Sequence, residues 1–191
     1  MTVDRLERAI VSTRGVLERV TSEQLDNDTP CASWKVRDVV NHIVGGTYSF
    51  AATAKTGEMP EGGGADAGRD FAAGDRLASF DRGAGDAVAA FSAPGVLDKT
   101  LKLPFGDLPG GVFVNIAASD VFQHGWDLAK STGQSTDLDP ALATELLEFG
   151  RAAIQEQFRG PDGKAPFGAE VTAPESATAA DQLAAFLGRT I

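Results

Sequence analysis

The chain has 191 residues, a length that predicts one domain over residues 1–191. It carries 27 acidic and 17 basic residues, which give a formal charge of −10 with both histidines neutral. Because phosphate binding draws on clustered Lys and Arg, this excess of acid argues against a nucleic-acid-binding protein. A hydrophobic fraction of 42% is too high for a disordered chain.

Neither a signal peptide nor a membrane span is predicted. The N-terminal segment carries a charge every few residues and lacks an apolar core. No window approaches the roughly 20 uninterrupted apolar residues that a membrane span requires. The single cysteine, Cys31, gives no sign of an oxidising compartment. We therefore expect a cytoplasmic protein with neither nucleic acid nor membrane as a partner.

Two amphipathic helices are predicted before residue 57. The apolar residues of the first recur at helical spacing, namely Val3, Leu6, Ile10, Leu17 and Val20. Residues 27–31 contain Pro30 and break the pattern, after which Ser33 is a candidate N-cap for the second helix. The inward stripe of the second helix consists of Val36, Val40, Ile43 and Thr47.

A glycine-rich segment follows at residues 57–74 and includes Gly62, Gly63 and Gly64. We interpret it as a mobile loop, because glycine clusters disfavour regular structure. Loops of this length inside a compact domain are often lids or binding loops. A tolerated surface insertion is the alternative interpretation.

The second half of the chain predicts further helices. Apolar spacing indicates a third helix over residues 77–91, weakened by Gly83 and Gly85, and then a short extended segment at residues 97–105. Residues 111–130 are helical again and end at Gly133. The next stripe follows Pro140 and consists of Leu142, Leu146, Phe149, Ala153 and Phe158. An extension from about residue 160 ends in a short helix around Leu183, Phe186 and Leu187. The sum predicts an all-α helical bundle.

The chemically informative residues are Asp120 and His124, which are four positions apart and so share one helix face. Their neighbours on that face are apolar, so the face should point into the bundle, where an unpaired charge is costly. A divalent metal ion is one partner that satisfies both groups. His42 lies near the apolar stripe of the second helix and can complete a site of two histidines and one carboxylate. The plainer alternative is an Asp120–His124 ion pair with His42 hydrogen-bonded to the backbone.

Two further residues lie close to this pattern. Asp127 follows His124 by three positions and is either a rival ligand or an acceptor for the other ring nitrogen of His124. Cys31 lies just ahead of the second helix and is either a fourth ligand or a small buried apolar residue.

Three stretches of the sequence resemble the mycothiol-dependent maleylpyruvate isomerase N-terminal domain family, of the DinB/YfiT-like group. Residues 29–42 (TPCASWKVRDVVNH) resemble its second-helix motif, and residues 120–128 (DVFQHGWDL) resemble its third bundle-helix motif. Residues 181–189 (DQLAAFLGR) resemble the closing helix of its actinobacterial branch. Each of the first two stretches contains one of the chain's two histidines.

The resemblance implies a four-helix bundle in up-down-down-up order with a short extra helix. It implies that His42, Asp120 and His124 hold a divalent metal ion at one end, most often zinc, with nickel or iron as alternatives. It further implies a transferase or isomerase that uses mycothiol or another small thiol, on a small-molecule substrate. A non-catalytic, stress-related bundle that binds metal or a small molecule is the alternative, and a homodimer is plausible.

Overall fold

The computed structural model describes residues 2–62, 68–161 and 163–191, and most of this part of the chain is helical. The helices are α1 (Thr2–Leu17), α2 (Val36–Thr56), α3 (Arg76–Phe91), α4 (Gly110–Ser131), α5 (Pro140–Ala153) and α6 (Ala179–Phe186), with 3-10 turns at Ser22–Gln24 and Glu156–Phe158. Strands β1 (Thr100–Leu101) and β2 (Leu108–Pro109) form one short antiparallel pair. The predicted all-α class is confirmed. No helix within the described residues is long and apolar enough to cross a membrane.

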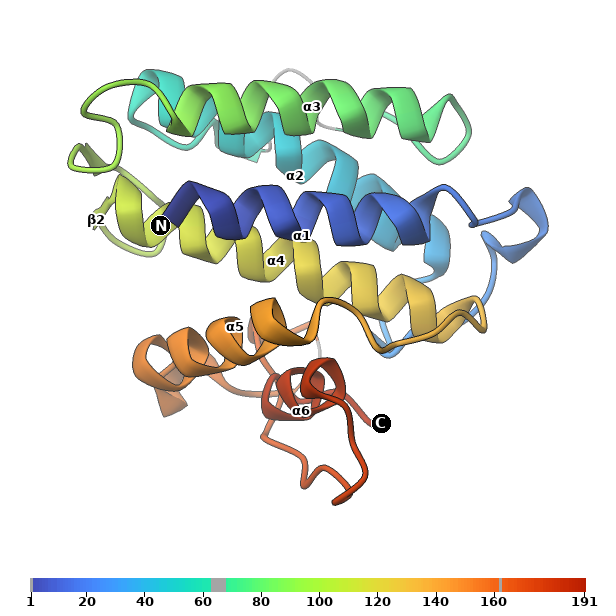
Figure 1. Cartoon of the computed structure of the whole chain (residues 1–191). Coiled ribbons are helices and arrows are strands. Elements are labelled where there is room, and N and C mark those ends of the chain that lie inside the picture. The colour runs from blue at the N-terminus through green and yellow to red at the C-terminus, as the bar shows by residue number, and fades with distance from the viewer. Residues whose placement is uncertain (1, 63–67, 162) are drawn as a thin grey trace.

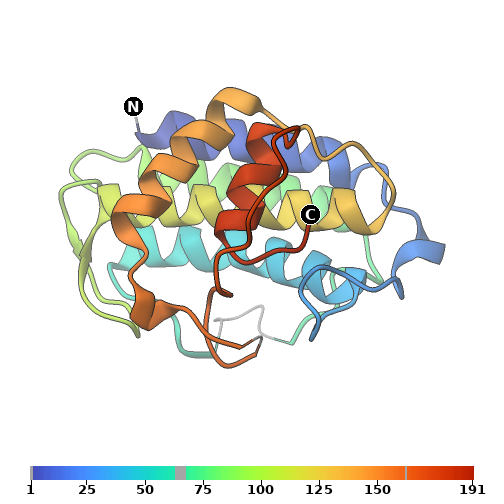
Figure 2. The same cartoon turned by 90° about the horizontal axis from the view of Figure 1, so that it is seen from below.

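Helices α1 to α4 form the bundle. α1 packs chiefly on α4, α2 packs chiefly on α3, and α2 also contacts α4. In Figure 1, α1 and α4 run in one direction while α2 and α3 run in the other, which is the up-down-down-up order. Figure 2 shows α5 and α6 lying across the outer side of α4.

The glycine-rich segment joins two parallel helices, α2 and α3, and so must return along the length of the bundle (Figure 1). It leaves α2 at Gly57, where φ is +90°. Its C-terminal part packs on the bundle, because Phe71 and Ala72 are buried and the Ala72 N–H donates to Asn41 Oδ1 at 2.9 Å. This part is therefore a docked crossover rather than a surface insertion. Residues 63–67 of the predicted loop lie outside the described residues.

Two sequence predictions about element ends were wrong. Ser33 does not cap α2: the Trp34 N–H donates to the Cys31 carbonyl in a turn, and the N-cap is Lys35, whose N–H donates to Asp38. Phe158 is not part of α5, which ends at Ala153, and it lies in a separate 3-10 turn. The expected short extended segment at 97–105 is present: Thr100 and Leu101 form β1, and residues 95–99 make tight turns before it.

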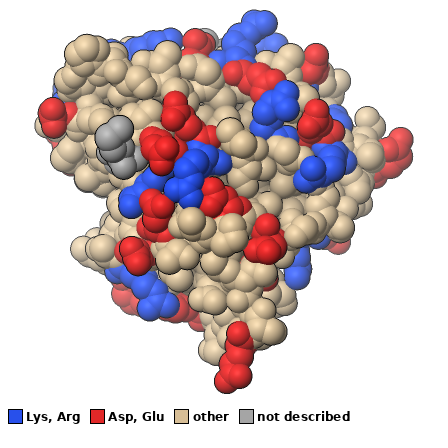
Figure 3. Space-filling view, viewed as in Figure 1, with Lys and Arg blue, Asp and Glu red and all other residues tan. Residues whose placement is uncertain are grey.

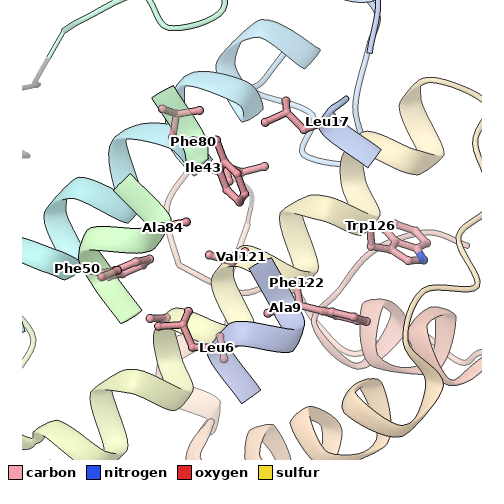
Figure 4. Packing of buried hydrophobic residues seen from close by; sticks show 14 of the residues in the cluster. Leu6, Ala9, Leu17, Ile43, Phe50, Phe80, Ala84, Val121, Phe122 and Trp126 are labelled. Atoms are coloured by element: carbon pink, nitrogen blue, oxygen red, sulfur yellow. The ribbon is translucent and has the colours of Figure 1, made fainter. Parts of the chain in front are cut away.

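The core lies between α1, α2, α3 and α4, and its members come from all four helices (Figure 4). The predicted stripe of α2 is fully buried at Val36, Val40, Ile43 and Thr47. Ion pairs fasten α1 to its neighbours on the outside: Arg5 and Arg8 to Glu145, Arg8 to Asp139, and Arg14 to Asp81. Figure 3 shows acidic and basic side chains interspersed on this face.

The C-terminal helix is tied to the bundle through Asp181. This carboxylate accepts a hydrogen bond from the Trp126 indole at 2.8 Å, and it forms a capping box with Thr178 at the start of α6. Burial alone raises the pKa of Asp181, but the hydrogen bonds from Trp126, Thr136 and Thr178 outweigh burial and hold the pKa below its usual range. The folded state therefore favours the ionised carboxylate.

This pairing predicts a loss of stability in acid. A group whose pKa is lowered by folding stabilises the fold above its unfolded pKa of about 4, and that contribution disappears as the pH falls through the lower folded pKa. Asp181→Asn should lower the free energy of unfolding by about 1.5 kcal/mol at pH 7. The deficit should shrink below pH ~4, where wild type loses the same contribution. Urea unfolding of both proteins from pH 3 to 7 measures this, and a deficit independent of pH would contradict it.

Candidate metal centre

Two neighbouring helices bring the three predicted ligands together. α2 supplies His42, and α4 supplies Asp120 and His124 one turn apart. His42 Nε2 lies 3.2 Å from Asp120 Oδ1, and His124 Nε2 lies 3.6 Å from the same oxygen. One ligand atom from each residue falls within 4.8 Å of the other two, a spacing that suits a single metal ion. The sequence patterns of two separate helices thus converge on one point.

The carboxylate of Asp120 is only half satisfied by the described residues. Its Oδ1 faces both histidines, whereas its Oδ2 is buried and has no hydrogen-bond partner among them. A Cβ atom added at Gly46 of α2 would lie 3.8 Å from Oδ2, so the glycine leaves space beside this oxygen. A buried carboxylate oxygen without a donor is costly, and a cation beside it would remove that cost. This orphaned oxygen is the structural sign that the residues fit a metal ion.

Asp120 and His42 each stabilise the charged form of the other. Burial alone lowers the pKa of His42, but the charge and hydrogen bond of Asp120 and the charge of Asp127 outweigh burial and raise the pKa. Burial alone raises the pKa of Asp120, yet His42 and His124 hold that pKa below its usual range. Asp120 is therefore ionised at neutral pH, which is the state a metal ligand requires.

Asp127 lies behind His124 and is fully buried. Its Oδ2 is 2.9 Å from His124 Nδ1, and its two oxygens lie 3.0 and 3.2 Å from Nε and Nη2 of Arg189. Burial alone raises the pKa of Asp127, but the hydrogen bond of His124 and the charge of Arg189 hold the pKa at about 2. Since an ionised carboxylate only accepts, Nδ1 of His124 is the donor in this hydrogen bond, and Nε2 is the ring nitrogen that faces Asp120. Asp127 thus has the geometry of the acceptor that orients a metal-ligating histidine.

A second group of candidate ligands consists of Cys31, His124 and Asp127. Cys31 is buried, and its Sγ lies 3.5 Å from Asp127 Oδ2. Both Asp127 oxygens already accept from charged or polar donors, whereas Asp120 keeps a buried oxygen without one. Of the two groups, only the one formed by His42, Asp120 and His124 contains a buried carboxylate oxygen without a donor among the described residues. Cys31 contacts Asp127, the carboxylate behind His124, and belongs to the second set of candidate ligands and not to the set with His42 and Asp120.

Sequence reasoning assigned no role to three other residues around the centre. The Trp34 ring lies 4.8 Å from the His42 ring and 5.5 Å from the His124 ring, centroid to centroid. Gln123 donates to Asp127 at 3.3 Å, and Arg189 pairs with the same carboxylate. Trp34, Gln123 and Arg189 all lie inside stretches that resemble the family motifs, and this was the signal in the sequence that could have pointed to them.

A cavity of about 810 Å³ opens beside the centre, and His42 and Asp120 form part of its wall. Its apolar lining includes Phe50, Phe71, Phe105, Phe113, Met59 and Ile116. Asn41, Ser49, Arg69 and Asp70 add polar groups. A cavity of this size with a few polar groups is typical of small-molecule sites. Trp126 does not line it and is fully buried in the core.

Comparisons with known proteins match most of the chain. The sequence model of the mycothiol maleylpyruvate isomerase N-terminal domain family matches residues 6–129. Two uncharacterized proteins of Mycobacterium tuberculosis, from strains CDC 1551 and H37Rv, are each 43% identical over 189 residues, which cover 97% of this chain and 96% of theirs. No solved structure matches significantly. The family match contains His42, Asp120, His124 and Asp127 and ends before α5.

Proposed function

The chain belongs to the mycothiol maleylpyruvate isomerase N-terminal domain family, and on that premise we propose that it binds a divalent metal ion for chemistry on a small thiol. The ligands are His42, Asp120 and His124. The observation that carries the proposal is that their ligand atoms lie within 4.8 Å of one another, while the second carboxylate oxygen of Asp120, Oδ2, is buried without a partner among the described residues. The activity is that of a thiol-dependent transferase or isomerase, with mycothiol as the co-substrate that the family suggests.

The donor set supports zinc as the metal. Two imidazole nitrogens and one carboxylate are typical ligands of catalytic zinc sites, which keep one position for water or substrate. Nickel and iron also bind such sets, so metal identity depends on supply as well as on ligands. A bound divalent ion would lower the pKa of a coordinated thiol and so supply a thiolate at neutral pH.

The chain's own residues would bind and orient the reactants. Asp127 holds the ring of His124, and the cavity beside His42 offers an apolar wall with polar groups at its edge. Both histidines of the chain belong to the centre, so neither remains as a separate general base. A proton released in the reaction must therefore pass to a carboxylate, to water or to the thiol.

Metal analysis followed by thiol titration tests the proposal. Protein incubated with zinc sulfate and then gel-filtered should retain about one zinc ion per chain. In the cobalt-substituted protein, mycothiol should add a thiolate-to-cobalt absorption band. In the presence of the protein, a panel of small electrophiles should then react with mycothiol faster than it does with mycothiol alone. A chain that retains no metal would overturn the proposal, whereas metal without an effect of thiol would indicate the non-catalytic binding bundle.

A further inference from the structure

The C-terminal segment contributes a cation to the rear of the candidate metal centre. Arg189 lies beyond residues 6–129, which the family model matches, yet it pairs with Asp127 through both guanidinium contacts. Its side chain is only 13% exposed and that of Asp127 is fully buried. A two-contact pair between an arginine and a buried carboxylate fixes the plane of the carboxylate as well as balancing its charge.

The backbone turn at the end of α6 directs the Arg189 side chain toward Asp127. α6 ends in a turn in which the Gly188 N–H donates to the Ala185 carbonyl and the Arg189 N–H donates to the Ala184 carbonyl. Gly188 has φ +91°, and a Cβ atom there would lie 2.5 Å from the Cα of Gly168. Only glycine fits this turn, so the direction in which the chain leaves α6 is set by packing.

The helix that carries this turn is itself held in place. Asp181 at the start of α6 accepts from Trp126 of α4, and Arg159 Nη1 donates to the carbonyls of Gly168 and Phe186 at its end. Arg189 is therefore presented to Asp127 by a fixed support.

We infer that Arg189 is a positioning residue of the metal centre: it fixes the carboxylate of Asp127, which in turn orients His124. The inference rests on the proposed function for the role of His124 as a ligand. Without the arginine, Asp127 is a buried carboxylate that keeps its contacts with His124, Gln123 and Cys31 but loses the two-contact pair that fixes its plane. His124 Nδ1 then loses a fixed acceptor, and the direction of Nε2 toward Asp120 is no longer set.

Two measurements on Arg189→Met test this inference. The first is the ¹⁵N chemical shift pattern of the His124 ring in metal-free protein, which should show a proton on Nδ1 in wild type and a mixture of tautomers in the variant. The second is zinc affinity, measured by competition with a chromophoric chelator, which should fall about tenfold or more. Arg189→Lys restores the charge without the planar fork and should recover part of both properties.

Arg159→Met is the matched control, because it removes an arginine that holds the same segment without contacting Asp127. It should keep the wild-type tautomer of His124 and lose less zinc affinity than Arg189→Met. If Arg189→Met does not fold, Arg189→Gln replaces it, with the same expected direction. A wild-type tautomer and wild-type affinity in the Arg189 variant, or an equal loss in the control, would overturn the inference. A wild-type chain that binds no zinc would instead overturn the proposed function, while the tautomer measurement would still test Arg189.

Discussion

Zinc is expected to raise the thermal stability of the wild-type chain and to leave that of Asp120→Asn almost unchanged. A ligand that binds only the folded state adds about 4 kcal/mol to the free energy of unfolding at a thousandfold excess over its Kd. For a domain of this size, that corresponds to a rise in Tm of roughly 10 °C. Asn keeps the volume of Asp120 but removes the negative charge of the ligating carboxylate, so zinc affinity should fall by about a thousandfold or more, which leaves a gain of about 0.4 kcal/mol or less at the same zinc concentration.

Thermal unfolding with and without zinc, followed by circular dichroism, measures this effect. His124→Ala should behave like Asp120→Asn, because it removes a second ligand of the same set. Asp86→Asn is the control: this acid lies on α3, its side chain is half-exposed, and it belongs to neither group of candidate ligands. It should gain as much stability from zinc as wild type. A full zinc-dependent gain in Asp120→Asn would contradict the proposed ligand set.

The helices were predictable because their signal is local. The period of apolar residues in α2, for example, reports directly which face is buried, and that stripe is buried as expected. Gly83 shows the limit of such reasoning: by sequence it weakens α3, but in the structure a Cβ atom there would lie 2.1 Å from Thr47 Oγ1. The glycine permits close packing of α3 on α2, and close packing between distant residues leaves no local pattern.

The candidate metal centre was likewise predictable only where the signal is local. Asp120 and His124 share a helix face by spacing alone, and His42 joined them because its own stripe pointed inward. Arg189 lies sixty-two residues from Asp127 in the chain, and no periodicity connects them. The Trp34 ring reaches both histidines from the turn before α2, where sequence reasoning expected a helix cap at Ser33. Loop and tail contacts depend on how the chain returns through space, which the sequence pattern does not record.

Trp126→Ala is expected to be the most destabilising single substitution considered for this chain. Trp126 is fully buried, and it belongs to the core cluster between α4 and its neighbours (Figure 4). Removing a buried tryptophan side chain leaves a cavity and costs about 3 to 5 kcal/mol. The substitution also removes the hydrogen bond to Asp181 that ties α6 to α4. Since domains of this kind are stable by only about 5 to 15 kcal/mol, a large fraction of the stability should be lost.

Trp126→Phe separates the two contributions. It keeps most of the apolar volume but removes the indole N–H, so Asp181 loses the donor from α4 and the expected cost is about 1.5 to 3 kcal/mol. In urea unfolding, the alanine variant should therefore show a clearly lower midpoint than the phenylalanine variant, with an unchanged slope if both remain two-state. Equal midpoints would mean that the hydrogen bond, not the buried ring, supplies the stability. Because α6 carries Arg189 toward Asp127, the phenylalanine variant should also bind zinc more weakly than wild type while keeping all three ligands.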